Sequence, residues 1–224
     1  MSMRSRKEIK AIGKQKFSAL YWPCVGAAFL VGLVSAAISG AASFAAEYGN
    51  WSFTINLAGL FITGNLSIGL AYFFIQLILG REEPDIGLPF RAGFENYGRK
   101  LGGFLWMTLF TFLWMLLFIV PGIVKSFAYA LTPYILADCP NVKAKDALKL
   151  SMRIMKGKKG SLFGFYLSFI GWGLLTCLTA GILGVFYVTP YLNNSMACWY
   201  LEAREDALRN GVITLGQLEG TEAV

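Results

Sequence analysis

The stretch LGGFLWMTLFTFLWMLLFIVPGIVKSFAYALTPYILA, residues 101–137, decides the fold of this chain. An α-helix rises about 1.5 Å per residue and the hydrocarbon core of a bilayer is about 30 Å thick, so a crossing needs roughly 20 residues. As a single helix the stretch would be about 55 Å long. Pro121-Gly122 stands near its middle, where proline and glycine break and reverse helices. The stretch therefore predicts a hairpin of helices 101–120 and 122–137, of which the second is short enough to be re-entrant instead.

The remaining apolar tracts extend this pattern to a whole membrane domain. Of the 224 residues, 56% are hydrophobic and 15% are charged, whereas a typical soluble domain has about 25% charged residues. The tract 161–201 would be about 60 Å long as one helix, and Thr179-Ala180-Gly181 near its middle predicts a second reversal. The sequence thus predicts an all-α polytopic membrane bundle with six transmembrane helices in three hairpins, at 20–42, 55–80, 101–120, 122–137, 161–179 and 182–203.

Lysine and arginine residues predict the orientation of these helices. They gather before residue 17, between 81 and 100, between 143 and 159, and after 203, while the segment 41–54 has none. Cytoplasmic loops of membrane proteins are enriched in these two residue types. We therefore expect both termini in the cytoplasm, a single integral membrane domain at 1–204, and a short, poorly ordered cytoplasmic tail at 205–224. On this layout the net charge of +7 sets topology and does not indicate nucleic-acid binding.

Residues 143–156 predict a cytoplasmic amphipathic helix. Small and apolar side chains recur on one helical face, and basic side chains occupy the other. Such a helix is expected in the headgroup layer, where its cations either enforce topology and solubility or bind anionic lipid or a partner. The basic face consists of Lys143, Lys145, Lys149, Arg153 and Lys156.

Polar residues inside the predicted helices are few. Apart from Glu202 at the end of the last helix, none is Asp or Glu, which weighs against an ion-driven transporter. Lys125, Asn65, Asn193 and Asn194 remain as candidates for a polar cavity. The alternatives are that Lys125 reaches the outer headgroups and that the asparagines form hydrogen bonds between helices.

Small residues at every fourth position mark the first predicted helix. Ala28, Gly32, Ala36 and Gly40 share one face, which would let another helix approach closely. Packing within the chain is the ordinary interpretation, and a homodimer seam is the alternative.

The chain offers little material for catalysis. It has no histidine, and its four cysteines contain no Cys-x-x-Cys pair, so we expect no catalytic, cofactor or metal site and no enzyme activity. An enzyme would need acids from the loops, such as Asp85, Glu95, Asp138 or Asp146, which form no recognisable catalytic spacing. Charged surface loops are the ordinary interpretation of these four residues.

Several runs of sequence resemble a known family. They are PGIVKSFAYALTPYILAD at 121–138, ALKLSMRIMKGKK at 147–159, LFGFYLSFIGW at 162–172 and TPY at 189–191. The chain resembles the uncharacterised bacterial integral membrane proteins grouped as domain of unknown function 975, and more loosely the membrane domain of some glycerophosphodiester phosphodiesterases. The resemblance implies a multi-pass protein of the bacterial cytoplasmic membrane, and it implies no activity or cofactor.

Two functions are compatible with these observations. The first is a non-enzymatic accessory, scaffold or lipid-interacting membrane protein, which the basic helix and the absence of histidine favour. The second is a small transporter, flippase-like protein or channel, whose path would run past Lys125, Asn65, Asn193 and Asn194.

Overall fold

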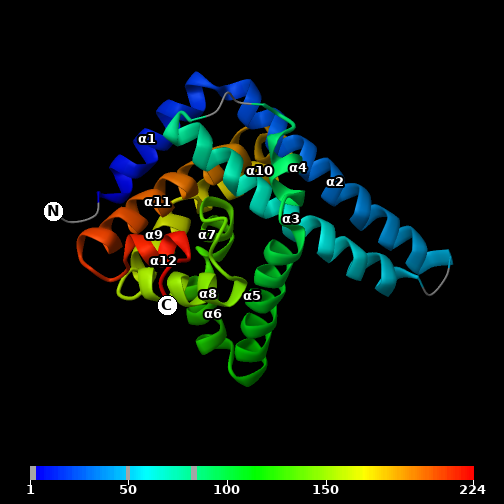
Figure 1. Cartoon of the computed structure of the whole chain (residues 1–224). Helices are drawn as coiled ribbons and strands as arrows, with labels where there is room; N and C mark the ends of the chain where they lie inside the picture. Colours follow the sequence, from blue (N-terminus) through cyan, green and yellow to red (C-terminus); the bar gives the residue numbers. More distant parts are fainter. Residues whose placement is uncertain (1–3, 49–50, 82–84) are drawn as a thin grey trace.

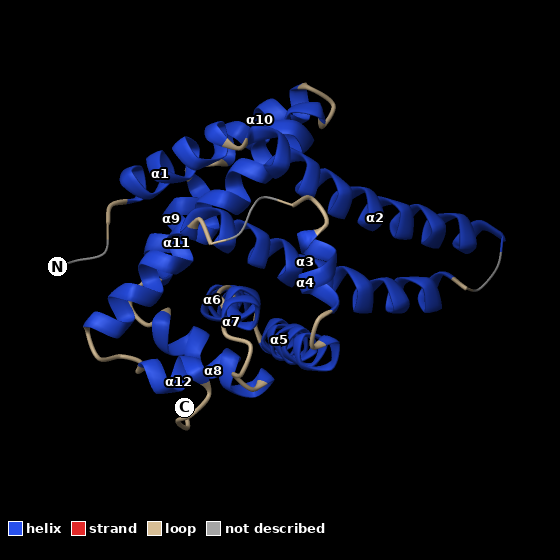
Figure 2. Cartoon of the chain, turned by 45° about the horizontal axis from the view of Figure 1, so that its top comes forward, coloured by secondary structure: helices blue, strands red, loops and turns tan. Residues whose placement is uncertain are grey.

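The computed structural model describes residues 4–48, 51–81 and 85–224, and within these ranges the chain forms helices and no strands (Figures 1 and 2). In chain order the helices are α1 Arg6–Ala19, α2 Tyr21–Tyr48, α3 Ser52–Leu79, α4 Leu88–Phe94, α5 Tyr97–Leu117, α6 Ile119–Tyr129, α7 Thr132–Asp138, α8 Ala144–Ile154, α9 Lys159–Leu167, α10 Ile170–Leu178, the π-helix η1 Gly184–Val188, α11 Thr189–Arg209 and α12 Leu215–Glu219.

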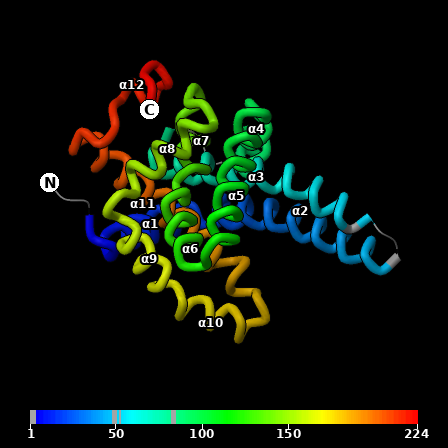
Figure 3. Tube along the Cα trace, turned by 90° about the horizontal axis from the view of Figure 1, so that it is seen from below, coloured from blue at the N-terminus to red at the C-terminus, as the bar shows by residue number. Residues whose placement is uncertain are grey.

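Three helical hairpins diverge from a common base. In Figure 1 the pair α2–α3 extends to the right and the pair α5–α6 extends downward, and Figure 3 shows α10 and η1 leaving the base in a third direction. The base is built around α1, α7, α8 and α11, which pack against one another or against the inner ends of the hairpins. The three hairpins therefore start from the same base and point in different directions.

The hydrophobic core lies in this base. Its largest fully buried side chains include Trp199 and Tyr200 of α11, Phe165 of α9 and Phe17 of α1. The ends of the hairpins expose large apolar side chains instead, such as Leu116 of α5 and Leu178 of α10. A surface of this kind is stable only where lipid replaces water, so the exposure pattern agrees with a membrane-embedded protein.

Five helical stretches are long and apolar enough to cross a membrane: Tyr21–Glu47, Phe53–Leu79, Tyr97–Leu117, Ile119–Asp138 and Lys159–Leu178. They correspond to the first five predicted spans. The sixth predicted span, 182–203, is not among them. It forms η1 and most of α11. Most apolar residues of α11 are buried in the protein core, and Glu202 and Asp206 are buried there as well. The α11 part of this predicted span therefore contributes to the core of the base.

The first predicted reversal is displaced by three residues. The chain turns at Phe118, which has extended backbone angles (φ −156°, ψ 134°), and Pro121 lies in the first turn of α6. A proline is tolerated there because the N–H groups of the first turn have no helical partner. Gly122 faces α5, where a Cβ atom would lie 2.6 Å from Cγ of Met115. Pro121-Gly122 thus starts the second helix and lets it approach the first, and it does not form the turn.

The second reversal lies where the sequence predicts it. α10 ends at Leu178, and Ala180 and Gly181 adopt left-handed backbone angles with φ values of 49° and 87°. Glycine takes this conformation without steric strain, which explains why the turn is encoded locally.

The segment 205–224 differs from the predicted poorly ordered tail. α11 continues to Arg209, and α12 follows with a capping box in which Thr214 and Gln217 exchange hydrogen bonds. Leu218 of α12 is buried against the base. The tail is therefore a part of the base, attached through an apolar contact.

Candidate functional site

The asparagines predicted to line a polar cavity make backbone hydrogen bonds. The amide of Asn65 donates to the carbonyl oxygen of Phe61 within α3, at 2.9 Å. The amide of Asn193 donates to Thr189 in the same way within α11, at 3.0 Å. Asn194 is fully buried and donates across to Gly13 of α1 at 2.6 Å. This last bond joins two helices that are far apart in sequence.

Lys125 lies elsewhere, on a cavity of about 420 Å³ between α5, α6 and α8. None of the three asparagines lines this cavity. The structure therefore does not assemble the predicted set of Lys125, Asn65, Asn193 and Asn194 around one space.

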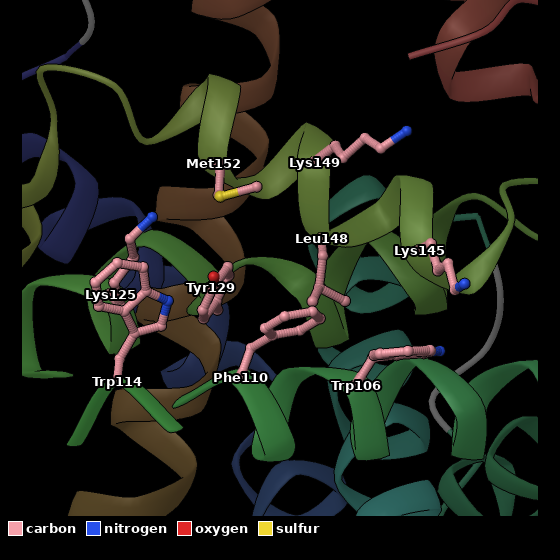
Figure 4. A pocket seen from close by; sticks show the side chains of 9 residues that line it. All are labelled: Trp106, Phe110, Trp114, Lys125, Tyr129, Lys145, Leu148, Lys149 and Met152. Atoms are coloured by element: carbon pink, nitrogen blue, oxygen red, sulfur yellow. The ribbon is translucent and has the colours of Figure 1, made fainter. Parts of the chain in front are cut away.

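The cavity combines an aromatic wall with a group of lysines (Figure 4). We call it the α5–α8 cavity. One side is formed by α5, and the opposite side by α8, with α6 closing the end near Lys125. Its lining consists of Trp106, Phe110, Trp114, Lys125, Tyr129, Lys145, Leu148, Lys149 and Met152.

The aromatic wall follows from the spacing of residues along α5. Trp106, Phe110 and Trp114 are four residues apart, and side chains at i, i+4 and i+8 lie on the same face of a helix. The rings of Trp106 and Phe110 stack with centroids 5.4 Å apart. These residues are not among the sites predicted from the sequence, although their regular spacing is a signal that could have identified them.

Two of the lysines lie over this wall. The Nζ atom of Lys125 is 4.8 Å from the ring centroid of Trp114, and that of Lys145 is 4.6 Å from the ring centroid of Trp106. These distances allow cation–π attraction, which is stronger where water is excluded. Lys149 instead pairs with Asp146 at 3.1 Å, and Figure 4 shows its ammonium group turned away from the rings. Lys125 and Lys145 are therefore the cations placed to meet a ligand on the aromatic wall.

The basic face of α8 is exposed. Its members Lys143, Lys145, Lys149, Arg153 and Lys156 all lie at the surface. The apolar face of α8 does not lie free for insertion between headgroups, because Ala147, Leu150 and Ile154 are buried against the protein. Ser151 on this face donates a 2.7 Å hydrogen bond to the carbonyl oxygen of Ala128 in α6. α8 is thus held to the protein by one face and presents its charges on the other.

Asp138 does not belong to a charged surface loop, although the sequence suggests it. Its side chain is 4% exposed and forms an ion pair with Arg204 of α11. The hydroxyl of Tyr200 also donates to Asp138, at 2.8 Å. The neighbouring Cys139 is buried, and burial raises the pKa of its thiol to about 12, so it is not a nucleophile at neutral pH. This group joins α7 to α11 and has a structural role.

Two further ion pairs fasten α11 to its neighbours. Lys158 approaches Asp206 to 2.7 Å, and its hydrogen bond holds the pKa of that carboxyl below the usual value. Arg4 pairs with Glu202, also at 2.7 Å. Together with Arg204, these pairs place charges around the C-terminal half of α11.

The small-residue face of α2 borders an open groove. Ala28, Gly32 and Ala36 line a cavity of about 250 Å³ together with Val185 of η1 and Thr189 of α11. A Cβ atom added to Gly32 or to Gly40 would meet no other atom within 4 Å. This part of the face is therefore not closed by packing within the chain.

Among the described residues no group of three or more Cys, Asp or Glu side chains could hold a metal ion, and the chain has no histidine. All four cysteines are free, with Cys24, Cys139 and Cys198 buried and Cys177 exposed.

Comparison with known proteins finds one family model that matches part of the chain. Residues 119–207 match the family model described as "Protein of unknown function (DUF975)", which confirms over this segment the resemblance seen in the sequence. The matched segment runs from α6 into α11 and includes Lys125 and Lys145. No curated protein and no solved structure matches the chain.

Proposed function

We propose that this chain is a non-enzymatic, multi-pass protein of the bacterial cytoplasmic membrane that binds anionic lipid and serves as a lipid-interacting accessory or scaffold. The observation that carries the proposal is the α5–α8 cavity, where Lys125 and Lys145 lie over an aromatic wall. One side of that cavity belongs to helices apolar enough for the membrane, and the other to a helix with an exposed basic face.

The proposal requires an amphiphile as the ligand. A small soluble anion would use the two ammonium groups and leave the rings of Trp106, Phe110 and Trp114 without a partner. A lipid would place its phosphate at the lysines and an acyl chain along the rings, so that both kinds of surface are used. The cavity volume of about 420 Å³ is within the range of ligand sites, and part of the lipid would remain in the bilayer.

The base is proposed to face the cytoplasm, with both termini on that side. α1, α8 and the region around Lys158 carry most of the basic residues, and anionic lipid is attracted to such a surface. A transporter or channel receives less support, because the polar residues that would line its path do not share one space.

The proposal predicts selective binding of anionic lipid. The full chain in nanodiscs would be titrated with spin-labelled phosphatidylglycerol and, separately, with spin-labelled phosphatidylcholine, and the fraction of immobilised label measured. We expect preference for phosphatidylglycerol, and we expect the double variant Lys125→Gln/Lys145→Gln to weaken its binding roughly thirtyfold, since each of the two cations near a headgroup contributes about 1 kcal/mol.

The matched control is Lys143→Gln/Lys156→Gln, which removes the same charge from exposed positions that do not line the cavity. This variant should retain most of the preference. If both double variants lose it equally, the cations act only as a diffuse surface charge and the cavity is not the site. If the unaltered protein shows no preference, lipid binding itself is refuted.

A further inference from the structure

We infer that two of the three hairpins, α5–α6 and α10–η1, enter the bilayer only about halfway, from the side of α1 and α8, and that their tips contact the acyl chains of that leaflet. Only α2–α3 then crosses the membrane. This goes beyond the proposed function, because it concerns the depth of the protein in the bilayer and holds whether or not the cavity binds lipid.

The hairpin α2–α3 is long enough to cross. From Tyr21, which follows directly after α1, to the end of α2 the helix is about 40 Å long, and α3 has the same number of residues. Its far end also carries residues suited to an aqueous surface. Glu47 stands at the end of the apolar stretch, and Trp51, which is 70% exposed, follows the turn. Tryptophan is enriched at such interfaces.

The position of α1 limits the depth of α10–η1. α1 runs antiparallel to α11, with contacts from Arg4 and Glu202, through Gly13 and Asn194, to Phe17 and Tyr187. Five basic residues lie on α1, at positions 6, 7, 10, 14 and 16, and the hydrocarbon core excludes such a helix. α11 and the end of η1 must therefore lie at the same level as α1, close to the headgroups.

Only a short part of the hairpin α10–η1 extends beyond the level of α1. Tyr187 is six residues from Gly181 at the turn, which is about 9 Å of helix. On the other leg, Lys10 donates a hydrogen bond to the hydroxyl of Ser168 at 3.0 Å. Ser168 is twelve residues from Ala180, or about 18 Å. Because the three hairpins point in different directions, these helix lengths are the greatest depths that the two legs can reach along the membrane normal, and both are far shorter than the hydrocarbon thickness of about 30 Å.

The position of α8 limits the depth of α5–α6 in the same manner. Lys145 lies over Trp106, which is twelve residues from the turn at Phe118 and so about 18 Å from it. Lys125 lies only seven residues beyond the turn, about 10 Å from it. If the turn reached the far surface, the exposed cations of α8 would stand in the middle of the bilayer.

The tips of the two short hairpins are apolar, unlike the tip of α2–α3. The five consecutive residues Leu116–Val120 around the Phe118 turn are each at least 64% exposed. Leu178 and Ile182 flank the other turn and are 82% and 65% exposed. Side chains of this kind are stable in the middle of the bilayer and are not expected at a water-facing turn. The positions of the basic residues and the exposed apolar side chains at the tips therefore indicate the same depth for both hairpins.

Spin labels can measure this depth. The exposed Cys177, three residues before Ala180, provides a label near one tip, while the other three cysteines are buried. In a Cys177→Ser background, Phe118→Cys and Leu116→Cys report on the other tip, and Trp51→Cys reports on the end of α2–α3. The full chain would be reconstituted in vesicles of about three parts phosphatidylcholine to one part phosphatidylglycerol, and label relaxation measured with oxygen and with a water-soluble nickel chelate.

We expect labels at positions 116, 118 and 177 to be reached by oxygen and protected from nickel, as in the bilayer centre, and the label at 51 to be reached by nickel. Access of nickel to 118 or 177 at the level found for 51 would overturn the inference and would restore a full crossing. Two labelled positions are used at the α5–α6 tip, so that the depth can still be measured if one of the two variants fails to fold. The lysine variants of the lipid-binding experiment do not enter this measurement, so either proposal can fail alone.

Discussion

Replacing Asp138 with asparagine is expected to lower the free energy of unfolding by about 3–5 kcal/mol, because it leaves a buried charge without its partner. The side chain of Arg204 is 23% exposed and has Asp138 as its ion-pair partner, and Tyr200 donates to the same carboxylate. An asparagine accepts these hydrogen bonds without compensating the guanidinium charge. Thermal unfolding of the purified protein in detergent, followed by circular dichroism, would measure the loss.

The exposed pair Asp146–Lys149 supplies the matched control. Its side chains are 27% and 52% exposed, and exposed pairs contribute at most about 1 kcal/mol. Asp146→Asn should therefore change the unfolding temperature little. The double variant Asp138→Leu/Arg204→Met should recover part of the loss of Asp138→Asn, since removing both charges also removes the desolvation penalty. Equal losses from Asp138→Asn and Asp146→Asn would show that the buried pair has no special importance.

This ion pair also illustrates what the sequence could not reveal. Asp138 and Arg204 are 66 residues apart in the sequence. Asn194 similarly finds its partner in Gly13, 181 residues away. Hydropathy reports the average environment of a segment, and it does not report which distant helix will cover a particular polar group. Pairings of this kind arise only when the base assembles.

The two reversals differ in how far they are encoded locally. Gly181 supplies a left-handed conformation at the turn itself, so the sequence predicts that turn correctly. At the other hairpin the turn falls at Phe118, three residues before Pro121-Gly122, because Gly122 is used for the contact with Met115 of α5. A glycine can thus mark a close approach between helices as well as a turn, and the sequence alone does not distinguish these uses.

The burial of α11 could not be predicted from the sequence either. The run 182–203 is predicted to cross the membrane, but in the structure most apolar residues of its α11 part are buried in the core of the base. The cause is α1, whose basic residues and Phe17 lie along α11 and η1. By contrast, the aromatic wall of the α5–α8 cavity is local, and the spacing of Trp106, Phe110 and Trp114 would have predicted it.

Replacing Gly69 with leucine is expected to lower the free energy of unfolding by about 3 kcal/mol or more, at least as much as overpacking normally does. The reason is that the added side chain would meet main-chain atoms of α4. α3 and α4 approach each other here so closely that a Cβ atom on Gly69 would overlap the carbonyl oxygen of Pro89 and lie 2.8 Å from the backbone nitrogen of Gly93. Across the same contact, a Cβ atom on Gly93 would lie 2.9 Å from the carbonyl oxygen of Asn65. A backbone cannot turn aside as a side chain can, so α4 as a whole must move. The unfolding temperature in detergent and the yield of folded protein would measure the effect.

Gly173 of α10 provides the control for this prediction, because a Cβ atom there would meet nothing within 4 Å. Gly173→Leu adds the same side chain to an exposed helical position and should leave the unfolding temperature unchanged or slightly raised, since glycine is a poor helix former. Gly69→Ala should fall between the two leucine variants, as even one methyl group must displace the carbonyl of Pro89. If Gly69→Ala unfolds at the temperature of the unaltered protein, α3 and α4 are not in backbone contact.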